Sequence, residues 1–166
     1  MRIVTASLTA TLLLISLQAR GDDDKDGPIR LEFGGADEWS LQDHQHQRGP
    51  GVGLEIESFK DFEIEIGTAP LRGGHTTEWN TDVIIKKEYP LSPNLEFEAG
   101  LGPEWNHTIG SHIRNSAGAA VEAELIYWTS ANHHLGWYVE PEYGYDFGKE
   151  HEQSLGIGVG LTVSLF

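Results

Sequence analysis

Acidic side chains recur at every second position in several segments of this chain. Strips of this kind begin at Glu55, Glu63, Glu96, Glu122 and Glu140. In an extended strand, residues i and i+2 lie on the same face, so each strip places its carboxylates on one side. If the strands close around a narrow space, these carboxylates cannot all ionise there without cations. The acids expected to line it are Glu55, Glu57, Glu63, Glu65, Glu78, Asp82, Glu96, Glu98, Glu104, Glu122, Glu124, Glu140, Glu142 and Asp146, with Arg30 and Lys86 as inward bases.

Carboxylate oxygens are the ligands that Ca²⁺ and Mg²⁺ prefer, so this pattern favours a divalent-cation site or a cation-selective path. Two other interpretations fit it: a hydrated plug that fills the lumen, or acids that face solvent on a soluble protein. The composition points to cationic counter-species, because 11 Lys and Arg stand against 26 Asp and Glu, giving a net charge of −15. Nucleic acid is not expected as a partner, since phosphate binding needs clustered cations.

Histidine supplies a second group of potential ligands. The candidate metal ligands are His44, His46, His75, His107, His112 and His151. They fall in the first, third, fifth and seventh connections between the predicted strands, which meet at one end of a meander. A His-x-His pair on an extended segment places both rings on one side, which suits Zn, Cu or Ni. The alternative is that these are ordinary polar loop residues, because no spacing here is a specific metal motif.

Residue types for hydrolysis occur at Ser111, His112 and Ser116, within one of the same connections. The sequence holds no nucleophile motif such as G-x-S-x-G. Its glycine-rich stretches lack the Gly-Lys-Ser/Thr of a phosphate-binding loop. We therefore expect a structural or binding role without catalysis and without a resident cofactor other than a divalent metal ion. An outer-membrane hydrolase is a weaker alternative.

Eight segments with period-two alternation must position these groups, and no helix is predicted between them. Regular short strands with short connections predict an all-β protein with an eight-stranded antiparallel up-and-down meander β-barrel. The connections after the second, fourth and sixth strands, at 59–61, 90–93 and 129–135, are expected to be shorter than those after the first, third and fifth, at 40–51, 70–76 and 107–118. The predicted strands are 29–35 (with an extension to 39 left open), 52–58, 62–69, 77–89, 94–106, 119–128, 136–147 and 153–166.

The face opposite the acids is apolar in most strands, and aromatic residues gather at the strand ends. Trp39, Trp79 and Trp105 fall at one end of the meander, and Tyr89, Tyr127, Trp128, Trp137 and Phe166 at the other. Two such girdles are typical of membrane interfaces. Glycines on the polar face would relieve crowding in a narrow lumen. These features favour a transmembrane barrel over a soluble barrel with the same alternation turned inside out.

The first 19 residues have the pattern of a signal peptide. Arg2 supplies the positive charge, the segment 3–17 is apolar, and Ala19 is a small residue before cleavage. Residues 20–28 form an acidic tail that we expect to be solvated. The chain contains no Cys, which excludes disulfides and a lipid-modified cysteine. Residues 29–166 then form one barrel domain.

The run from Leu155 to Phe166 alternates large apolar with small or polar residues, as a closing barrel strand does. With the export signal, the strand count and the girdles, it resembles the small eight-stranded bacterial outer-membrane β-barrel proteins over 29–166. The resemblance implies a monomer in the bacterial outer membrane, in contact with outer-membrane lipid. Its lumen would be filled by side chains, so a wide pore is not expected. The alternative is a soluble periplasmic barrel that binds a small apolar ligand and has inward aromatics without girdles.

Overall fold

Eight strands make up most of the described chain. The computed structural model describes residues 29–59, 62–110, 113–148 and 151–165, so the predicted signal peptide and acidic tail lie outside the described residues. Within these ranges, no helix is long and apolar enough to cross a membrane. The strands are β1 (Ile29–Ser40), β2 (His46–Phe59), β3 (Phe62–Gly73), β4 (Thr76–Ser92), β5 (Leu95–Ile109), β6 (Arg114–Trp128), β7 (Leu135–Asp146) and β8 (Gln153–Ser164).

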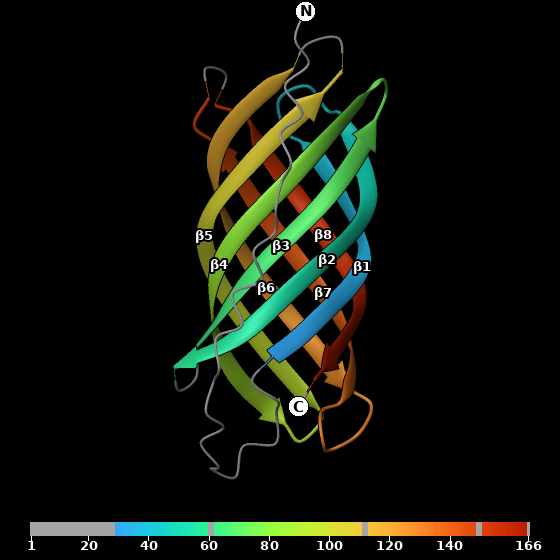
Figure 1. Cartoon of the computed structure of the whole chain (residues 1–166), viewed down its shortest axis with the longest axis vertical. Helices are drawn as coiled ribbons and strands as arrows, with labels where there is room; N and C mark the ends of the chain where they lie inside the picture. Colours follow the sequence, from blue (N-terminus) through green and yellow to red (C-terminus); the bar gives the residue numbers. More distant parts are fainter. Residues whose placement is uncertain (1–28, 60–61, 111–112, 149–150, 166) are drawn as a thin grey trace, which may run out of the picture.

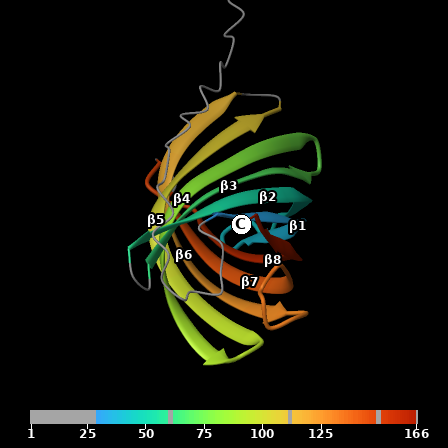
Figure 2. The same ribbon diagram turned by 60° about the horizontal axis from the view of Figure 1, so that its bottom comes forward.

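The strands form a closed antiparallel barrel, which confirms the predicted meander. Each strand pairs with the next in sequence, and β8 closes against β1 from Arg30↔Ser164 to Ser40↔Ser154. Figure 1 shows the strands tilted against the long axis, and Figure 2 shows them following one another around the barrel. Because the strand number is even, β1 begins and β8 ends at the same end, here called the terminal end. The opposite loop end carries the links 41–45, 74–75, 110–113 and 147–152.

The first three strands are longer than the sequence pattern predicts, with 12, 14 and 12 residues. Pairing continues through positions that composition marks as turns, as in Gly35↔Pro50 and Arg48↔Arg72. The links at the loop end are correspondingly shorter than predicted. The expected difference in length between the two ends is wrong, because the link 129–134 at the terminal end is longer than 41–45, 74–75 and 110–113 at the loop end.

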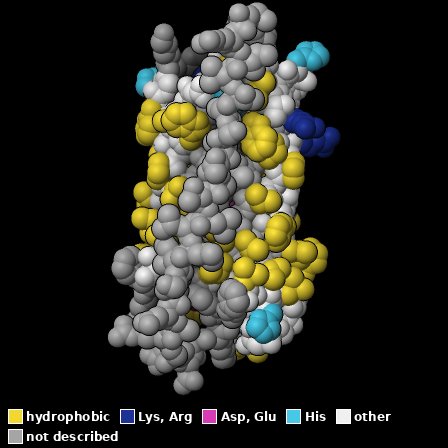
Figure 3. Space-filling view, viewed as in Figure 1, with side chains coloured by type: hydrophobic (Ala, Val, Ile, Leu, Met, Phe, Trp, Pro, Cys, Tyr) yellow, Lys and Arg dark blue, Asp and Glu magenta, His cyan; other side chains and the backbone are white. Residues whose placement is uncertain are grey.

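Polar and apolar side chains lie on opposite sides of the barrel wall. The inner face buries Arg30, Lys86 and most of the predicted lumen carboxylates. Large apolar side chains stay exposed on the outer face, with Leu101 68% and Ile85 57% exposed. Figure 3 shows such side chains as a yellow band along the barrel wall. This polarity is the reverse of that in a soluble barrel and is the one expected against lipid.

Exposed aromatic side chains ring both ends of the outer face. They are Trp39, Trp79 and Trp105 toward the loop end, and Tyr89, Tyr127 and Trp137 toward the terminal end. The prediction is wrong for Trp128, whose side chain is fully buried in the lumen. Trp128 shares the alternation of Glu122 and Glu124, so it must point inward with them. Phe166 lies outside the described residues, and Leu165 beside it is exposed.

Inward glycines make room for large lumen side chains, as predicted. A Cβ atom at Gly160 would lie 2.7 Å from Cε1 of Tyr138. One at Gly100 would lie 2.7 Å from Cγ2 of Ile84 and 2.8 Å from Cγ of Lys86. Gly100 is the register partner of Lys86, and Gly160 is the register partner of Tyr138. A long cation and a ring can therefore occupy the narrow lumen because the paired position on the neighbouring strand has no side chain.

Candidate functional site

Arg30, near the start of β1, points into the lumen and contacts four carboxylates. Its Nε lies 2.9 Å from Oε2 of Glu55, and its Nη1 lies 3.1 Å from Oε1 of Glu96. Its Nη2 donates to Oε1 of Glu98 at 2.5 Å and also pairs with Glu63. The acids come from β2, β3 and β5, so one guanidinium ties together strands on several sides of the barrel.

Lys86 on β4 forms a second ion-pair centre. Its Nζ lies 2.7 Å from Oε2 of Glu124 and 2.8 Å from Oε2 of Glu140. The same ammonium pairs with Glu65, and Oε2 of Glu122 is 3.9 Å away. The lysine side chain has no exposed surface, so its charge is neutralised entirely by groups inside the barrel.

Glu55 joins the two centres, because its Oε2 contacts Arg30 and its Oε1 lies 3.2 Å from Nζ of Lys86. The Trp128 ring lies 5.8 Å from the Arg30 guanidinium, and its Nε1 donates to Oε2 of Glu96 at 2.9 Å. We call this region the plug: Arg30, Lys86, Trp128, and the carboxyl groups of Glu55, Glu63, Glu65, Glu96, Glu98, Glu122, Glu124 and Glu140. Every carboxyl group of the plug lies within 3.9 Å of a cationic nitrogen, and buried side chains fill the lumen there.

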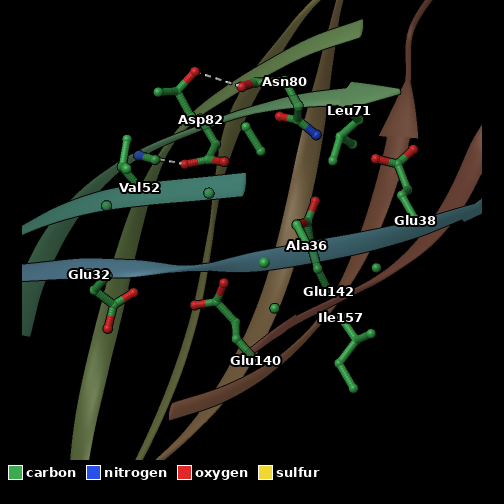
Figure 4. A pocket seen from close by; sticks show the side chains of 18 of the residues that line it. Glu32, Ala36, Glu38, Val52, Leu71, Asn80, Asp82, Glu140, Glu142 and Ile157 are labelled. Atoms are coloured by element: carbon green, nitrogen blue, oxygen red, sulfur yellow. Dashed lines mark hydrogen bonds between the residues drawn. The ribbon is translucent and has the colours of Figure 1, made fainter. Parts of the chain in front are cut away.

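A cavity of about 70 Å³ lies between the plug and the loop end. Four of its acids, here called the upper carboxylates, are Glu32 and Glu38 of β1, Asp82 of β4 and Glu142 of β7. Figure 4 shows these side chains around a common space. Asp82 accepts a hydrogen bond from the backbone nitrogen of Gly67 at 2.9 Å. Within the described ranges, none of the four forms an ion pair with Lys, Arg or His.

Glu32 is the most deeply buried upper carboxylate. It is 2% exposed, and its Oε1 has no hydrogen-bond partner among the described residues. One of its oxygens lies within 4.8 Å of carboxylate oxygens of Glu55 and Glu65, and another such group joins it with Glu124 and Glu140. Burying a charged group without a partner is costly. A cation held by these oxygens would offset that cost.

A wider cavity of about 260 Å³ forms a vestibule at the loop end, and Glu38 lines both cavities. Its charged lining residues are Glu38, Asp43, Glu78, Glu104, Arg114, Asp146 and Glu152. Arg114 donates from Nη2 to Oδ2 of Asp146 at 3.1 Å, and its Nη1 lies 3.0 Å from Oε2 of Glu152. The lumen is therefore acidic from its mouth down to the plug.

Asp43 sits in the link 41–45, at the mouth of the vestibule. Hydrogen bonding with the Ser40 side chain and with the backbone of Gln45 holds the pKa of Asp43 below its ordinary value. A carboxylate with a lowered pKa is ionised at neutral pH. The mouth of the lumen thus presents a fixed negative charge to entering ions.

The predicted His44-x-His46 pair does not lie on one extended segment. His44 has a φ of 58°, which is left-handed, whereas His46 begins β2. Nε2 of His46 lies 2.6 Å from Oδ1 of Asp37, and its ring stacks on Trp39 with centroids 5.1 Å apart. The expectation that both rings share a side is wrong, because the left-handed residue breaks the period-two geometry.

The described candidate histidines His75, His107 and His151 lie toward the loop end, although His107 is within β5 rather than in a connection, and His107 and His151 make separate contacts. Nδ1 of His107 lies 2.6 Å from Oδ1 of Asn115, and Nδ1 of His151 lies 3.2 Å from the hydroxyl of Tyr145. His75 is in the link 74–75, and His112 lies outside the described residues. Among the described residues, the groups of three close potential ligands contain glutamates only. A metal site built from these histidines stays a prediction.

The residues considered for hydrolysis are only partly described. Ser111, like His112, lies outside the described ranges. Ser116 lies on β6, opposite Asn106 of β5. The described chain therefore supplies no nucleophile and base in contact at this position.

Most of the predicted lumen acids do line the lumen, and they are joined by Glu32 and Glu38, which were not among those predicted. The signal was present, because Glu32 shares the alternation of Arg30, which was placed inward. Glu38 lies in the extension of the first strand to residue 39, which the sequence pattern left open. Glu57, which was predicted to be inside, is exposed beside the register shift between Glu57 and Phe59.

Comparison with known proteins confirms the predicted resemblance at the level of fold. No protein-family model and no curated protein sequence matches the chain. The structure of Neisserial surface protein A matches with a TM-score of 0.67 and 12% identity, covering 82% of this chain and 96% of that one. Ail, the attachment invasion locus protein of Yersinia pestis, gives 0.64 and 13%, covering 84% and 99%. OprG of Pseudomonas aeruginosa gives 0.66 and 10%, covering 86% and 99%. The chain has the fold of small eight-stranded outer-membrane barrels.

Proposed function

We propose that this protein is a bacterial outer-membrane barrel that binds hard divalent cations in the upper lumen, between the vestibule and the plug. The membrane location is supported by the exposed apolar outer face, the two aromatic girdles and the fold shared with outer-membrane barrels. The loop end then faces the exterior, and the terminal end, where β1 begins and β8 ends, faces the periplasm.

The observation that carries the cation proposal is the distribution of partners along the lumen. Each plug carboxyl group has a cation of this chain beside it, whereas the upper carboxylates have none among the described residues. The Oδ1 atom of Asn80, which lines the same cavity, also has no hydrogen-bond partner there. Carboxylate and amide oxygens together form the ligand set that Ca²⁺ accepts in flexible geometry.

The plug argues for binding rather than conduction. Arg30 is 2% exposed, and Lys86 and Trp128 have no exposed surface. The plug side of the cavity is lined by Glu65 and Glu140, and both pair with the Lys86 ammonium. A cation that enters from the vestibule therefore approaches a fixed positive charge, which opposes further movement. The lumen would therefore hold ions at a dead end open to the loop end.

Calorimetry with Ca²⁺ on the folded barrel in detergent tests the cation proposal. We expect saturable binding, and at least tenfold weaker binding when Glu32→Gln and Glu142→Gln are combined. Glu57→Gln is the matched control, because it removes an exposed carboxylate outside the cavity. Equal affinity in the double variant and in wild type would contradict the proposal. Zn²⁺ titrated into the Ca²⁺-saturated protein tests the predicted histidine site separately.

Membrane fractionation with a heat-dependent shift in gel mobility tests the location. We expect the protein in the outer-membrane fraction, running as a compact band until it is boiled. Recovery in the soluble periplasmic fraction would refute the location while leaving the calorimetric result standing.

A further inference from the structure

Two arginines lie side by side on the outer face near the loop end. Arg48 of β2 and Arg72 of β3 are directly opposed register partners, and both are exposed. Opposed residues of an antiparallel pair have Cα atoms roughly 4.5 to 5.5 Å apart, and like charges so placed repel each other. No ion pair within the described residues involves either arginine. We call these two residues the arginine pair.

The arginine pair stands out against the charge distribution of the whole barrel. Among the described strand residues, the carboxylates share the alternation of the inner face except for Asp37, although Glu57 at the end of β2 is exposed. Arg48, Arg72 and Lys87 face outward. Asp37 is a register partner of Arg48, but its Oδ1 contacts His46 at 2.6 Å. A chain with a net charge of −15 therefore presents cations to its surroundings at the barrel wall.

The arginine pair lies at the height of the loop-end girdle. On β2, His46 is the outward residue that precedes Arg48, and its ring stacks on Trp39. On β4, which is next to β3, Trp79 is exposed. Figure 3 shows the visible Lys and Arg side chains gathered at one edge, beside the upper part of the yellow band. Aromatic girdles mark the membrane interface, which is the depth of the lipid phosphates.

We propose that the arginine pair binds the phosphate group of a phosphorylated glycolipid in the outer leaflet. A guanidinium presents planar paired donors that match phosphate oxygens, and a bound phosphate removes the repulsion between the two arginines. Farther toward the terminal end, beyond Pro50 on β2 and Pro70 and Thr68 on β3, the outer face carries Val52 and Ile66, which are 49% and 45% exposed. Acyl chains of the same molecule can lie along this surface, which favours a lipid over free phosphate. The proposal rests on the proposed membrane location.

Native mass spectrometry of the folded barrel in detergent tests this site, with diphosphorylated lipid A as the probe. We expect wild type to retain one lipid A molecule and to lose it at least tenfold more readily when Arg48→Gln and Arg72→Gln are combined. Lys87→Gln is the matched control, because it removes the outward cation that lies over Phe62 and Tyr89 at the other rim. Lipid A stripped of its phosphates should bind wild type as weakly as lipid A binds the double variant.

Three outcomes would overturn the lipid site: equal retention by the double variant and wild type, an equal loss in Lys87→Gln, or displacement of the lipid by millimolar inorganic phosphate. The last result would identify a free-anion site in place of a lipid site. Fractionation of the double variant separates failure of this inference from failure of the membrane location, because a lost lipid site leaves the protein in the outer membrane.

Discussion

The plug and the upper carboxylates use the same side chains in one lumen but differ in their partners. In the plug, eight carboxyl groups surround two buried cations, and Glu55 bridges Arg30 and Lys86 at 2.9 and 3.2 Å. A few residues farther toward the loop end, Glu32 is equally buried but forms no ion pair with a cation among the described residues. The difference shows that a count of lumen acids does not identify a site, whereas the positions of the cations do.

The two regions should also respond differently to the removal of a charged side chain, because the plug stabilises the fold whereas the upper carboxylates are proposed to bind cations. Removing one partner of a buried ion pair leaves an uncompensated charge and destabilises the fold by about 3–5 kcal/mol. Removing an acid that has no partner takes away a source of repulsion instead. The same kind of substitution should therefore change stability in opposite directions in the two regions.

The largest expected effect is in the plug. Lys86→Met removes the ammonium that Glu124 and Glu140 contact at 2.7 and 2.8 Å. We expect the free energy of unfolding in detergent to fall by about 3–5 kcal/mol, measured by urea titration. Lys87→Met is the matched control, because this neighbour points outward, and we expect it to cost under about 1 kcal/mol. Equal losses in the two variants would mean that the plug does not stabilise the barrel.

An added methyl group should destabilise the barrel more beside the plug than beside the upper cavity. Gly100→Ala places a Cβ 2.6 Å from the carbonyl oxygen of Ile85, beside the plug, and should cost about 1–3 kcal/mol through overpacking. Gly156→Ala, beside the upper cavity, places its Cβ 3.4 Å from Cβ of Glu142. This is an ordinary contact, so we expect a change within about 0.5 kcal/mol. Equal costs in urea unfolding would contradict a filled lower lumen and a roomier upper lumen.

The smallest expected effect is an increase in the free energy of unfolding rather than a decrease. With EDTA present, Glu32→Gln should raise the free energy of unfolding by about 1 kcal/mol, because an amide can donate to the neighbouring carboxylates of Glu55 and Glu65. The stabilisation of wild type by Ca²⁺, about 2.7 kcal/mol at a hundredfold excess over Kd, should be reduced in this variant. Thermal unfolding with and without Ca²⁺ measures both effects, and a Ca²⁺ response unchanged by the substitution would argue against Glu32 as a ligand.

Sequence alternation predicted the fold and the polarity of the lumen, because side-chain direction in a strand has a period of two. It therefore placed Arg30 and Lys86 inside together with most of the acids. Aromatic position alone misplaced Trp128, since a residue at a strand end can belong to either face. Trp128 shares the period-two alternation of Glu124 along β6, and this alternation predicts an inward side chain, whereas its place at the strand end does not.

The strand bounds and the partners within the lumen could not be obtained from the sequence. Pairing across Gly35 and Pro50 depends on the neighbouring strand, which local composition does not show. Whether an inward acid has a cation depends on the stagger of strands across the barrel. Arg30 reaches acids of β5, and Lys86 reaches acids of β6 and β7. The upper carboxylates therefore become visible only once the barrel is closed.

The most direct test of the cation-binding account is anomalous diffraction from crystals soaked in Mn²⁺, which accepts the same oxygen ligands as Mg²⁺ and Ca²⁺. The account predicts an anomalous peak in the upper cavity, bounded by Glu32, Asp82, Glu140 and Glu142. No peak is expected inside the plug, where every carboxyl group already lies beside Arg30 or Lys86. A peak restricted to exposed carboxylates or to the histidines of the loop end would contradict it, as would an upper cavity without Mn²⁺ at saturating concentration.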